Sequence, residues 1–195
     1  MTTYHISPTH RRRSIRLKGY DYSQAGAYFV TMCTHNRDML FGEIAEDTMV
    51  LNNTGHIVAD EWLKSARIRA EIELDAWVVM PNHIHGIVVI IDPERGWPSA
   101  SSGPSPRSLG ALIAGFKSAV TKRINAERNT PGTPVWQRNY YEHIIRTKTA
   151  LNRIRQYIIN NPSRWSDDRE NYVGATGRSP LCVGKDKTGW RVRGQ

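Results

Sequence analysis

Apolar residues recur with two different periods along this chain, and the period changes at residues that favour turns. Segments rich in β-branched and aromatic residues predict strands. They cover residues 28–34, 72–80, 83–91 and 135–146, with a short hairpin in 39–44 and 49–51. In 83–91 (HIHGIVVII) apolar side chains occupy both parities, so we expect a central strand that is covered on both faces.

Three other segments repeat apolar residues at spacings of three and four, which predicts helices with one buried face. The first begins at Asn53 or Thr54, either of which can cap it, and runs to about residue 70. The second begins at Leu109, and the third covers 148–161, just before a helix-ending proline.

The order of these elements predicts an α+β fold. Strand, helix, strand, strand, helix, strand and helix follow one another, which indicates a ferredoxin-like or RRM-like antiparallel sheet with packed helices. We expect residues 27–165 to form the domain, with a mobile Gly/Pro/Ser-rich loop at 93–108. A basic arm (1–26) and a basic tail (166–195) flank it.

Composition narrows the class of protein. The 195 residues hold 27 Lys and Arg against 18 Asp and Glu, for a net charge of +9. Only two cysteines occur, which excludes a disulfide scaffold and a Cys-rich zinc module. The apolar runs are too short for a bilayer span, and the N-terminus is charged where a signal peptide is apolar. These features predict a cytoplasmic protein with no membrane partner.

Basic residues gather in places that suit nucleic acid. The N-terminal arm carries five of them within eight residues, without an acid among them, and such clusters commonly contact phosphates. The candidates for DNA binding are Arg11, Arg12, Arg13, Arg16, Lys117, Lys122 and Arg138. The alternative is a solvated tail for the arm and a solvated helix face for the two lysines.

His83 and His85 are the first candidates for chemistry. They lie two residues apart at the start of a strand, so both imidazoles point to the same face. Two ring nitrogens placed in this way can share one metal ion. The alternative is a chance pair in which one histidine caps a turn.

Tyr157 and Asn161 are the second pair. Four residues apart, they are expected to be neighbours on one face of the last helix. At 100° per residue they lie about 90° and about 50° from the centre of the apolar stripe, at the border of the buried seam. The alternative is a half-buried tyrosine followed by an asparagine that caps the helix.

Three strings of this sequence together resemble a known family. They are VMPNHIHG at 79–86, VWQRNYYEHIIR at 135–146 and YIINNP at 157–162. They resemble the single-tyrosine HUH transposases, and the Tyr-x-x-x-Asn-Pro ending is most similar to the REP-associated tyrosine transposases. The similarity covers about residues 20–165. It does not extend to the Pro/Ser-rich loop or the C-terminal tail.

The resemblance implies an HUH endonuclease fold and specific roles for residues. His83 and His85 would bind Mg²⁺ or Mn²⁺, Asn161 would supply a further ligand, and Tyr157 would be the nucleophile. The implied activity is a metal-dependent single-stranded DNA endonuclease and strand transferase. It cleaves at hairpin-bearing, REP-like palindromes through a covalent 5′-phosphotyrosine. It also implies a bacterial, nucleoid-associated protein.

Two other functions stay open from the sequence. One is a non-catalytic, RRM-like module that binds single-stranded nucleic acid. The other is a replication-initiator-like nickase with the same chemistry, although no helicase segment accompanies it. The residues are compatible with a monomer and with a homodimer.

Overall fold

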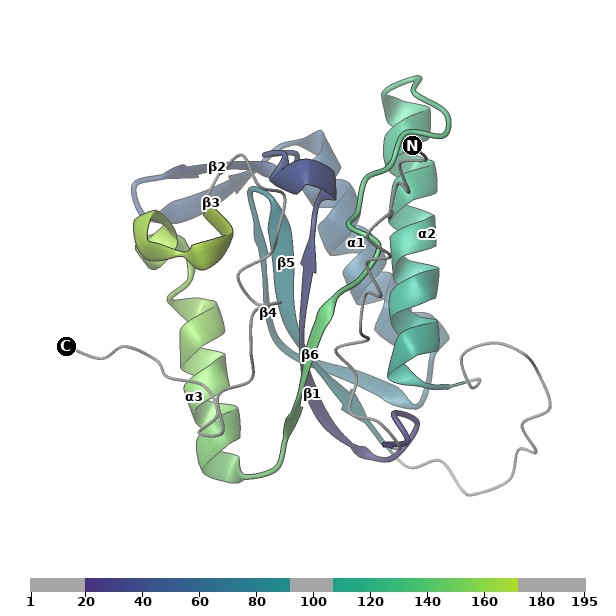
Figure 1. The fold of residues 1–195 in the computed structure, drawn as a ribbon, viewed down its shortest axis with the longest axis vertical. Coiled ribbons are helices and arrows are strands. Elements are labelled where there is room, and N and C mark those ends of the chain that lie inside the picture. The colour runs from purple at the N-terminus through teal and green to yellow at the C-terminus, as the bar shows by residue number, and fades with distance from the viewer. Residues whose placement is uncertain (1–19, 92–106, 172–195) are drawn as a thin grey trace, which may run out of the picture.

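A four-stranded antiparallel sheet forms the centre of the computed structural model, which describes residues 20–91 and 107–171 (Figure 1). Its strands follow the order β4-β5-β1-β6. They are β1 (Gly26–Cys33), β4 (Ile72–Met80), β5 (His83–Ile90) and β6 (Tyr141–Ile145). A separate hairpin pairs β2 (Gly42–Ala45) with β3 (Thr48–Leu51). The predicted α+β antiparallel architecture is confirmed.

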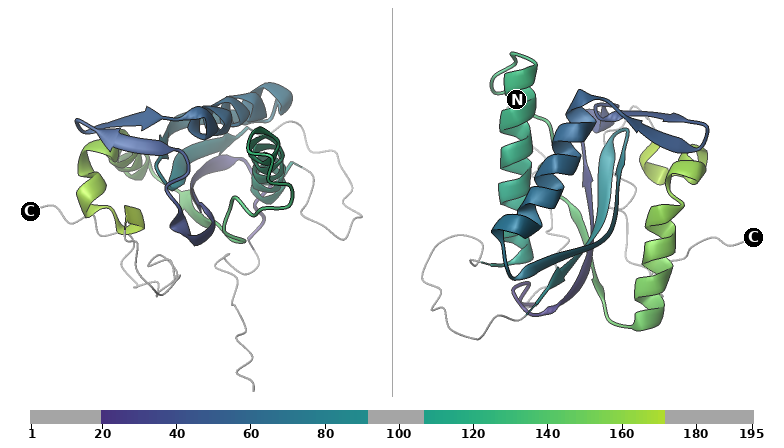
Figure 2. Two further views of the ribbon diagram at one scale, coloured as in Figure 1. Left: turned by 90° about the horizontal axis from the view of Figure 1, so that it is seen from above. Right: turned by 180° about the vertical axis from the view of Figure 1, so that it is seen from behind.

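Helices cover the sheet on both faces (Figures 1 and 2). α1 (Asn53–Ile68) and α2 (Leu109–Glu127) lie on one face, and α3 (Lys148–Ile159) lies on the other. The strand order places β5 between two neighbours, and its residues are buried on both sides. The expectation that 83–91 is a central strand is therefore confirmed.

The two faces of the sheet hold two separate apolar cores, as the period of two requires. Tyr28, Val30 and Met32 of β1 pack toward α1 and α2, where Trp62 and Phe116 lie. On the other face, the core joins the sheet to α3 through side chains from both. Its buried members are Phe29, Ile87, Ile145, Ile154 and Ile158.

Gly86 follows His85 in β5 and precedes the apolar residues 87–90 that complete the strand. A Cβ atom at this position would stand 2.6 Å from Cζ2 of Trp62. The missing side chain therefore lets the fully buried indole of α1 lie directly on the sheet. Its neighbour His85 points to the opposite face.

The structure corrects two of the predicted boundaries. Residues 135–140 leave the sheet, and Trp136 makes only an isolated bridge to Thr34. Backbone N–H of Gln137 still donates to the carbonyl oxygen of Cys33 at 2.9 Å, while the carbonyls of Gln137 and Asn139 accept hydrogen bonds from a lysine of α2. The side chain of Asn52 caps α1, one residue before the predicted candidates.

The last helix also differs from its prediction. α3 ends at Ile159 instead of continuing to 161. Two 3-10 segments follow, η2 (Pro162–Asp167) and η3 (Arg169–Asn171), so the fold continues beyond residue 165. A third segment, η1 (His35–Arg37), follows β1. These short turns gather at the end of the sheet where β5 begins (Figure 1).

Residues 1–19, 92–106 and 172–195 lie outside the described part of the chain. The predicted loop, the tail and most of the basic arm therefore stay predictions. Within residues 20–91 and 107–171, no helix is long and apolar enough to cross a membrane.

Candidate metal centre and neighbouring tyrosine

His83 and His85 lie side by side at the beginning of β5, on the face that α3 covers. Their ring centroids are 4.4 Å apart, and both side chains are almost fully buried. In the pairing register they stand opposite Cys33 and Thr31 of β1. The predicted same-face arrangement is thus what the strand provides.

Burial keeps both rings neutral. It lowers the pKa of His83 to about 3, and the nearby positive charge of Arg37 acts in the same direction. The pKa of His85 is well below its ordinary value because of burial and then because of His83, while Asp168 opposes the shift. A neutral imidazole offers a lone pair, which is the form that binds metal.

The imidazole nitrogens differ in their partners. Nδ1 of His85 lies 2.8 Å from the Thr31 hydroxyl, and its Nε2 lies 3.2 Å from Oη of Tyr157. Nε2 of His83 is buried and has no hydrogen-bond partner among the described residues. An unsatisfied buried nitrogen costs free energy, and a bound cation would satisfy it.

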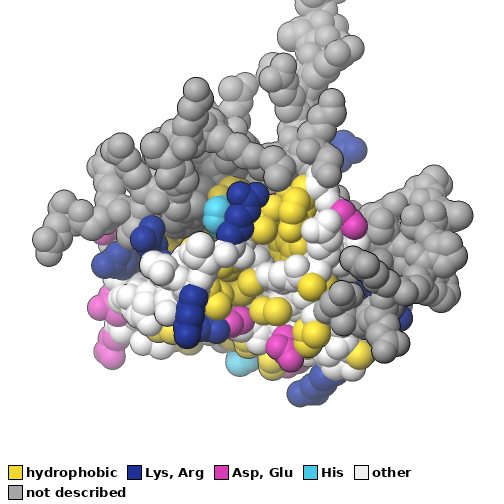
Figure 3. Space-filling model, turned by 90° about the horizontal axis from the view of Figure 1, so that it is seen from below, with side chains coloured by type: hydrophobic (Ala, Val, Ile, Leu, Met, Phe, Trp, Pro, Cys, Tyr) yellow, Lys and Arg dark blue, Asp and Glu magenta, His cyan; other side chains and the backbone are white. Residues whose placement is uncertain are grey.

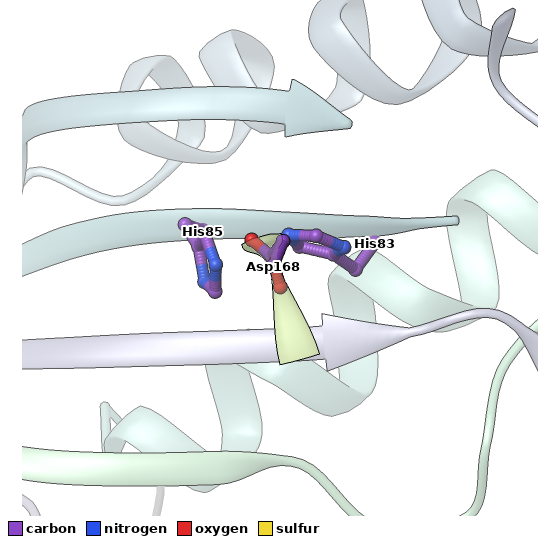
Figure 4. A group of neighbouring side chains, drawn as sticks. All are labelled: His83, His85 and Asp168. Atoms are coloured by element: carbon purple, nitrogen blue, oxygen red, sulfur yellow. The ribbon is translucent and has the colours of Figure 1, made fainter. Parts of the chain in front are cut away.

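Asp168 completes the group. It lies between η2 and η3, and one ligand atom each of His83, His85 and Asp168 lie within 4.8 Å of one another. Figure 4 shows the carboxylate between the two rings. Backbone N–H of Glu170 donates to its Oδ1 at 2.7 Å, and the Asn161 amide donates to its Oδ2 at 2.8 Å. These contacts hold the carboxylate in place.

The sequence did not single out Asp168. Three acids follow Pro162 within eight residues, namely Asp167, Asp168 and Glu170, and spacing alone does not separate them. Only the turn between η2 and η3 decides that Asp168 faces the histidines. The sequence signal for Asp168 was only that acidic residues follow shortly after the helix that bears the tyrosine.

Tyr157 reaches the same place from α3. Its ring centroid lies 5.2 Å from that of His85 and 6.1 Å from that of Phe29. Arg155, two residues earlier, binds the carboxylate of Asp75 with an Nε–Oδ1 distance of 2.8 Å. This ion pair joins α3 to β4 beside the register shift between residues 74 and 77. The phenol therefore stands next to the histidine pair.

Asn161 also lies at the group, but not as the sequence predicted. Because α3 ends at Ile159, Asn161 lies beyond the helix, at the start of η2, and reaches the group from there. Its side chain is buried, and its Oδ1 has no hydrogen-bond partner within the described residues. That oxygen stays a candidate ligand beside Asp168.

The basic candidates are spread over the molecule. Lys117 and Lys122 belong to α2, on the face of the sheet opposite the histidines. Nζ of Lys117 donates to the backbone carbonyls of Gln137 and Asn139, both at 2.9 Å, and burial lowers its pKa to about 8. Its role in the structure is to hold that loop. Lys122 and Arg138 are exposed.

The four arginines of the predicted arm, Arg11, Arg12, Arg13 and Arg16, lie outside the described residues. On the face in Figure 3, Lys and Arg side chains are interspersed with acidic, hydrophobic and neutral ones. The described surface in that view therefore has no continuous basic patch.

The donor set fits a divalent cation. Two neutral imidazoles and one carboxylate offset only one of its two charges, which leaves the site attractive to an anion such as phosphate. Imidazole and carboxylate ligands are compatible with several divalent ions, so these residues do not select one by themselves. The group can hold a metal ion.

Comparison with known proteins identifies one relative by sequence and solved structures with a similar fold. No known family profile matches the chain. An uncharacterized protein of Haemophilus influenzae is 39% identical over 178 residues, which cover 87% of this chain and 98% of that protein.

Solved structures are more distant. A REP-associated tyrosine transposase bound to a REP hairpin is similar with a TM-score of 0.52 and 20% identity, over 85% of this chain and 74% of that one. A transposase-like protein from Deinococcus radiodurans gives a TM-score of 0.43 and 18% identity, over 74% and 97%. The first likeness confirms, for the fold, the resemblance seen in the sequence.

Proposed function

The chain belongs to one family with the Haemophilus influenzae protein and has the fold of a REP-associated tyrosine transposase, and on these premises we propose that it is such a transposase. Its activity is metal-dependent cleavage and rejoining of single-stranded DNA. One observation carries the proposal: Oη of Tyr157 lies 3.2 Å from Nε2 of His85, next to a group that can hold a metal ion.

His83, His85 and Asp168 would hold the metal, and Asn161 has a buried oxygen that could be added to them. The ion is Mg²⁺ or Mn²⁺, as the family resemblance implies. When bound, such an ion would polarise a phosphoryl oxygen of the DNA and would offset the negative charge that develops during cleavage.

Tyr157 carries the covalent step. Its phenol loses a proton to water, and the oxygen attacks the scissile phosphorus in line with the leaving 3′ oxygen. The Oη–P bond forms as the P–O3′ bond breaks, and the 3′ oxygen takes up a proton. The products are a 5′-phosphotyrosine and a free 3′-OH. Attack by a strand 3′-OH reverses the step, so no nucleotide cofactor is consumed.

The substrate is single-stranded DNA with a hairpin of the REP type. The structure with the similar fold was solved with a REP hairpin bound, and the net charge of +9 suits a polyanionic partner. The fold itself hosts binding modules as well as enzymes, so the chemistry rests on the tyrosine and the metal group.

The test uses the full chain with an end-labelled hairpin DNA that carries a single-stranded flank. With Mg²⁺ or Mn²⁺ we expect a protein–DNA adduct that survives denaturation, and a chelator or His83→Ala should abolish it. The His83→Ala protein should still bind DNA, because binding rests on charge. Binding without cleavage in the unaltered protein, across both metals, would identify a binding module and refute the proposal.

The basic arm provides affinity more than sequence preference. Replacing Arg11, Arg12 and Arg13 with Ala removes up to three phosphate contacts, and each contributes about 0.7 to the salt slope on a single strand. We expect a flatter slope for every DNA sequence tested, measured by fluorescence anisotropy across salt concentrations. Loss of preference for one sequence at an unchanged slope would contradict this role.

A further inference from the structure

Asn82 precedes the histidine pair and is completely buried, although it is not a candidate ligand. We propose that Asn82 is a positioning residue that keeps the proton of neutral His83 on Nδ1, so that the Nε2 lone pair is free for the metal. That the free Nε2 lone pair serves to bind a metal rests on the proposed metal-dependent function. The position of the proton on His83 does not depend on that function.

The orientation of the Asn82 amide follows from its partners. Its Nδ2 lies 2.7 Å from the backbone carbonyl oxygen of Glu170 and 3.4 Å from that of Arg37. Carbonyl oxygens only accept hydrogen bonds, so the amide nitrogen must face them. The amide oxygen then faces Nδ1 of His83, at 2.8 Å.

An amide oxygen also only accepts. Nδ1 of His83 must therefore be the donor in this contact, and a neutral ring carries a single proton. Nε2 is left with its lone pair, and it is this nitrogen that has no hydrogen-bond partner among the described residues. Protonation at Nε2 would leave Nδ1 and the Asn82 oxygen as two facing acceptors.

His85 provides a contrast on the same strand. Its Nδ1 contacts the hydroxyl of Thr31, which can donate or accept, so this contact imposes no tautomer. Only at His83 does the partner of Nδ1 determine which ring nitrogen carries the proton. Asn82 should therefore affect one ring of the pair and leave the other unchanged.

The carbonyl groups that orient Asn82 are themselves clamped. Nη2 of Arg37 and Oε2 of Glu170 form an ion pair at 2.9 Å, with both side chains buried. Sγ of Cys33 donates to the same carboxylate oxygen at 3.2 Å. Asn36 and Arg37 have φ values of 54° and 61°, in the left-handed region, which is uncommon for residues other than glycine and less so for asparagine.

The clamp links chain segments that are far apart in sequence. Glu170 belongs to η3 and Arg37 to η1, and both present a backbone carbonyl to the residue that orients His83. Partners of this kind fix the tautomer and orientation of metal-binding histidines, and their loss costs about 10- to 100-fold in metal affinity.

The experiment reads the proton directly. Long-range ¹H–¹⁵N correlation spectra of the full-length, metal-free protein, labelled at histidine, distinguish the Nδ1–H and Nε2–H forms. We expect His83 to be the Nδ1–H form in the unaltered chain. An Nε2–H form of His83 in that chain would overturn the proposal without any variant.

Two variants separate positioning from packing. Asn82→Ala removes the acceptor and should release the Nδ1–H form. Asn139→Ala, the same change at an exposed site, should leave His83 unchanged. Retention of the Nδ1–H form in Asn82→Ala, with His85 also unchanged, would refute the role.

Mn²⁺ binding, followed by electron paramagnetic resonance, tests whether the contact between Asn82 and His83 contributes to metal affinity. Asn82→Ala should bind Mn²⁺ about 10- to 100-fold more weakly, and Asn139→Ala should bind it as the unaltered protein does. Equal affinity in Asn82→Ala and the unaltered protein would contradict the inference. If the unaltered protein binds no Mn²⁺, the proposed metal-dependent function fails, while the spectra still decide where the His83 proton lies.

Discussion

Replacing Tyr157 with Phe removes one oxygen and leaves the ring in place. The ring contacts that hold the side chain, to His85 at 5.2 Å and to Phe29 at 6.1 Å between centroids, do not involve the hydroxyl. The change deletes the hydrogen bond to Nε2 of His85, which is 3.2 Å long. It also deletes the only atom of this side chain that can attack phosphorus.

The expected effect on stability is small. A hydrogen bond of this kind contributes about 0.5–1.5 kcal/mol net, and a half-buried, long bond belongs at the lower end. For a chain of this size, 1 kcal/mol corresponds to roughly 2–4 °C in Tm. We therefore expect Tyr157→Phe to lower Tm by no more than a few degrees while cleavage and the covalent adduct disappear.

The assay combines a denaturing gel of the labelled adduct, peptide mapping, thermal melting and DNA affinity at one salt concentration. Tyr141→Phe is the matched control. Tyr141 is half-buried on the same face of the sheet, and its ring centroid lies 6.2 Å from that of Phe29. The control should keep both the adduct and the melting temperature within a few degrees.

Three results would refute this reasoning. A phosphotyrosine mapped to Tyr140 or Tyr141, or an adduct that survives Tyr157→Phe, would mean that another residue attacks. A fall in Tm of ten degrees or more would show that the hydroxyl is a structural element, and loss of activity would then say nothing of catalysis.

Three further predictions follow from other parts of the structure. Asp168→Asn should weaken Mn²⁺ binding at least about 10-fold, since it neutralises the one acid of the group; calorimetric titration measures this. Gly86→Ala should lower the free energy of unfolding by about 1–3 kcal/mol, seen in thermal melts, because the new methyl group meets Trp62 at 2.6 Å. Hydrogen bonding from Arg155 lowers the pKa of Asp75. The pair therefore stabilises the fold fully above the unfolded-state pKa of Asp75, and this stabilisation is lost as pH falls through the folded-state pKa. Asp75→Asn should flatten the acid limb of a Tm–pH curve.

Each of these has a matched control. Asp167→Asn, the same change at an exposed neighbour, should leave Mn²⁺ binding unaltered. Gly115→Ala, in α2 where a Cβ atom meets nothing within 4 Å, should stabilise the chain by about 0.5–1 kcal/mol. Equal affinity in Asp167→Asn and Asp168→Asn would contradict the first prediction. Destabilisation by both glycine variants would contradict the second, and an unchanged acid limb in Asp75→Asn the third.

Periodicity was enough to predict much of this protein. The period of two in a strand places His83 and His85 on one face whatever surrounds them, and apolar residues on both parities mark that strand as central. The three-and-four spacing located the helices, including the one that bears Tyr157. These features depend on neighbours along the chain, so they can be read locally.

Boundaries were less predictable because distant residues set them. The β-prone stretch 135–140 forms only an isolated bridge, and two of its carbonyls bind Lys117 of α2, a partner that nothing within the stretch signals. The helix expected to reach Asn161 stops at Ile159, and the chain turns there into η2. Tyr157 and Asn161 both reach the histidine group, but Asn161 does so from the turn after the helix and not from the helix itself.

The composition of the site was decided by the tertiary structure. Asp168 is one of three acids in a short polar stretch, and only the fold of η2 and η3 brings it between the imidazoles (Figure 4). The tautomer of His83 likewise depends on an amide whose orientation is set by carbonyls of Arg37 and Glu170, which are over 130 residues apart. Sequence determines which side chains share a face through repeats of a few residues, whereas contacts between remote turns exist only after the chain has packed.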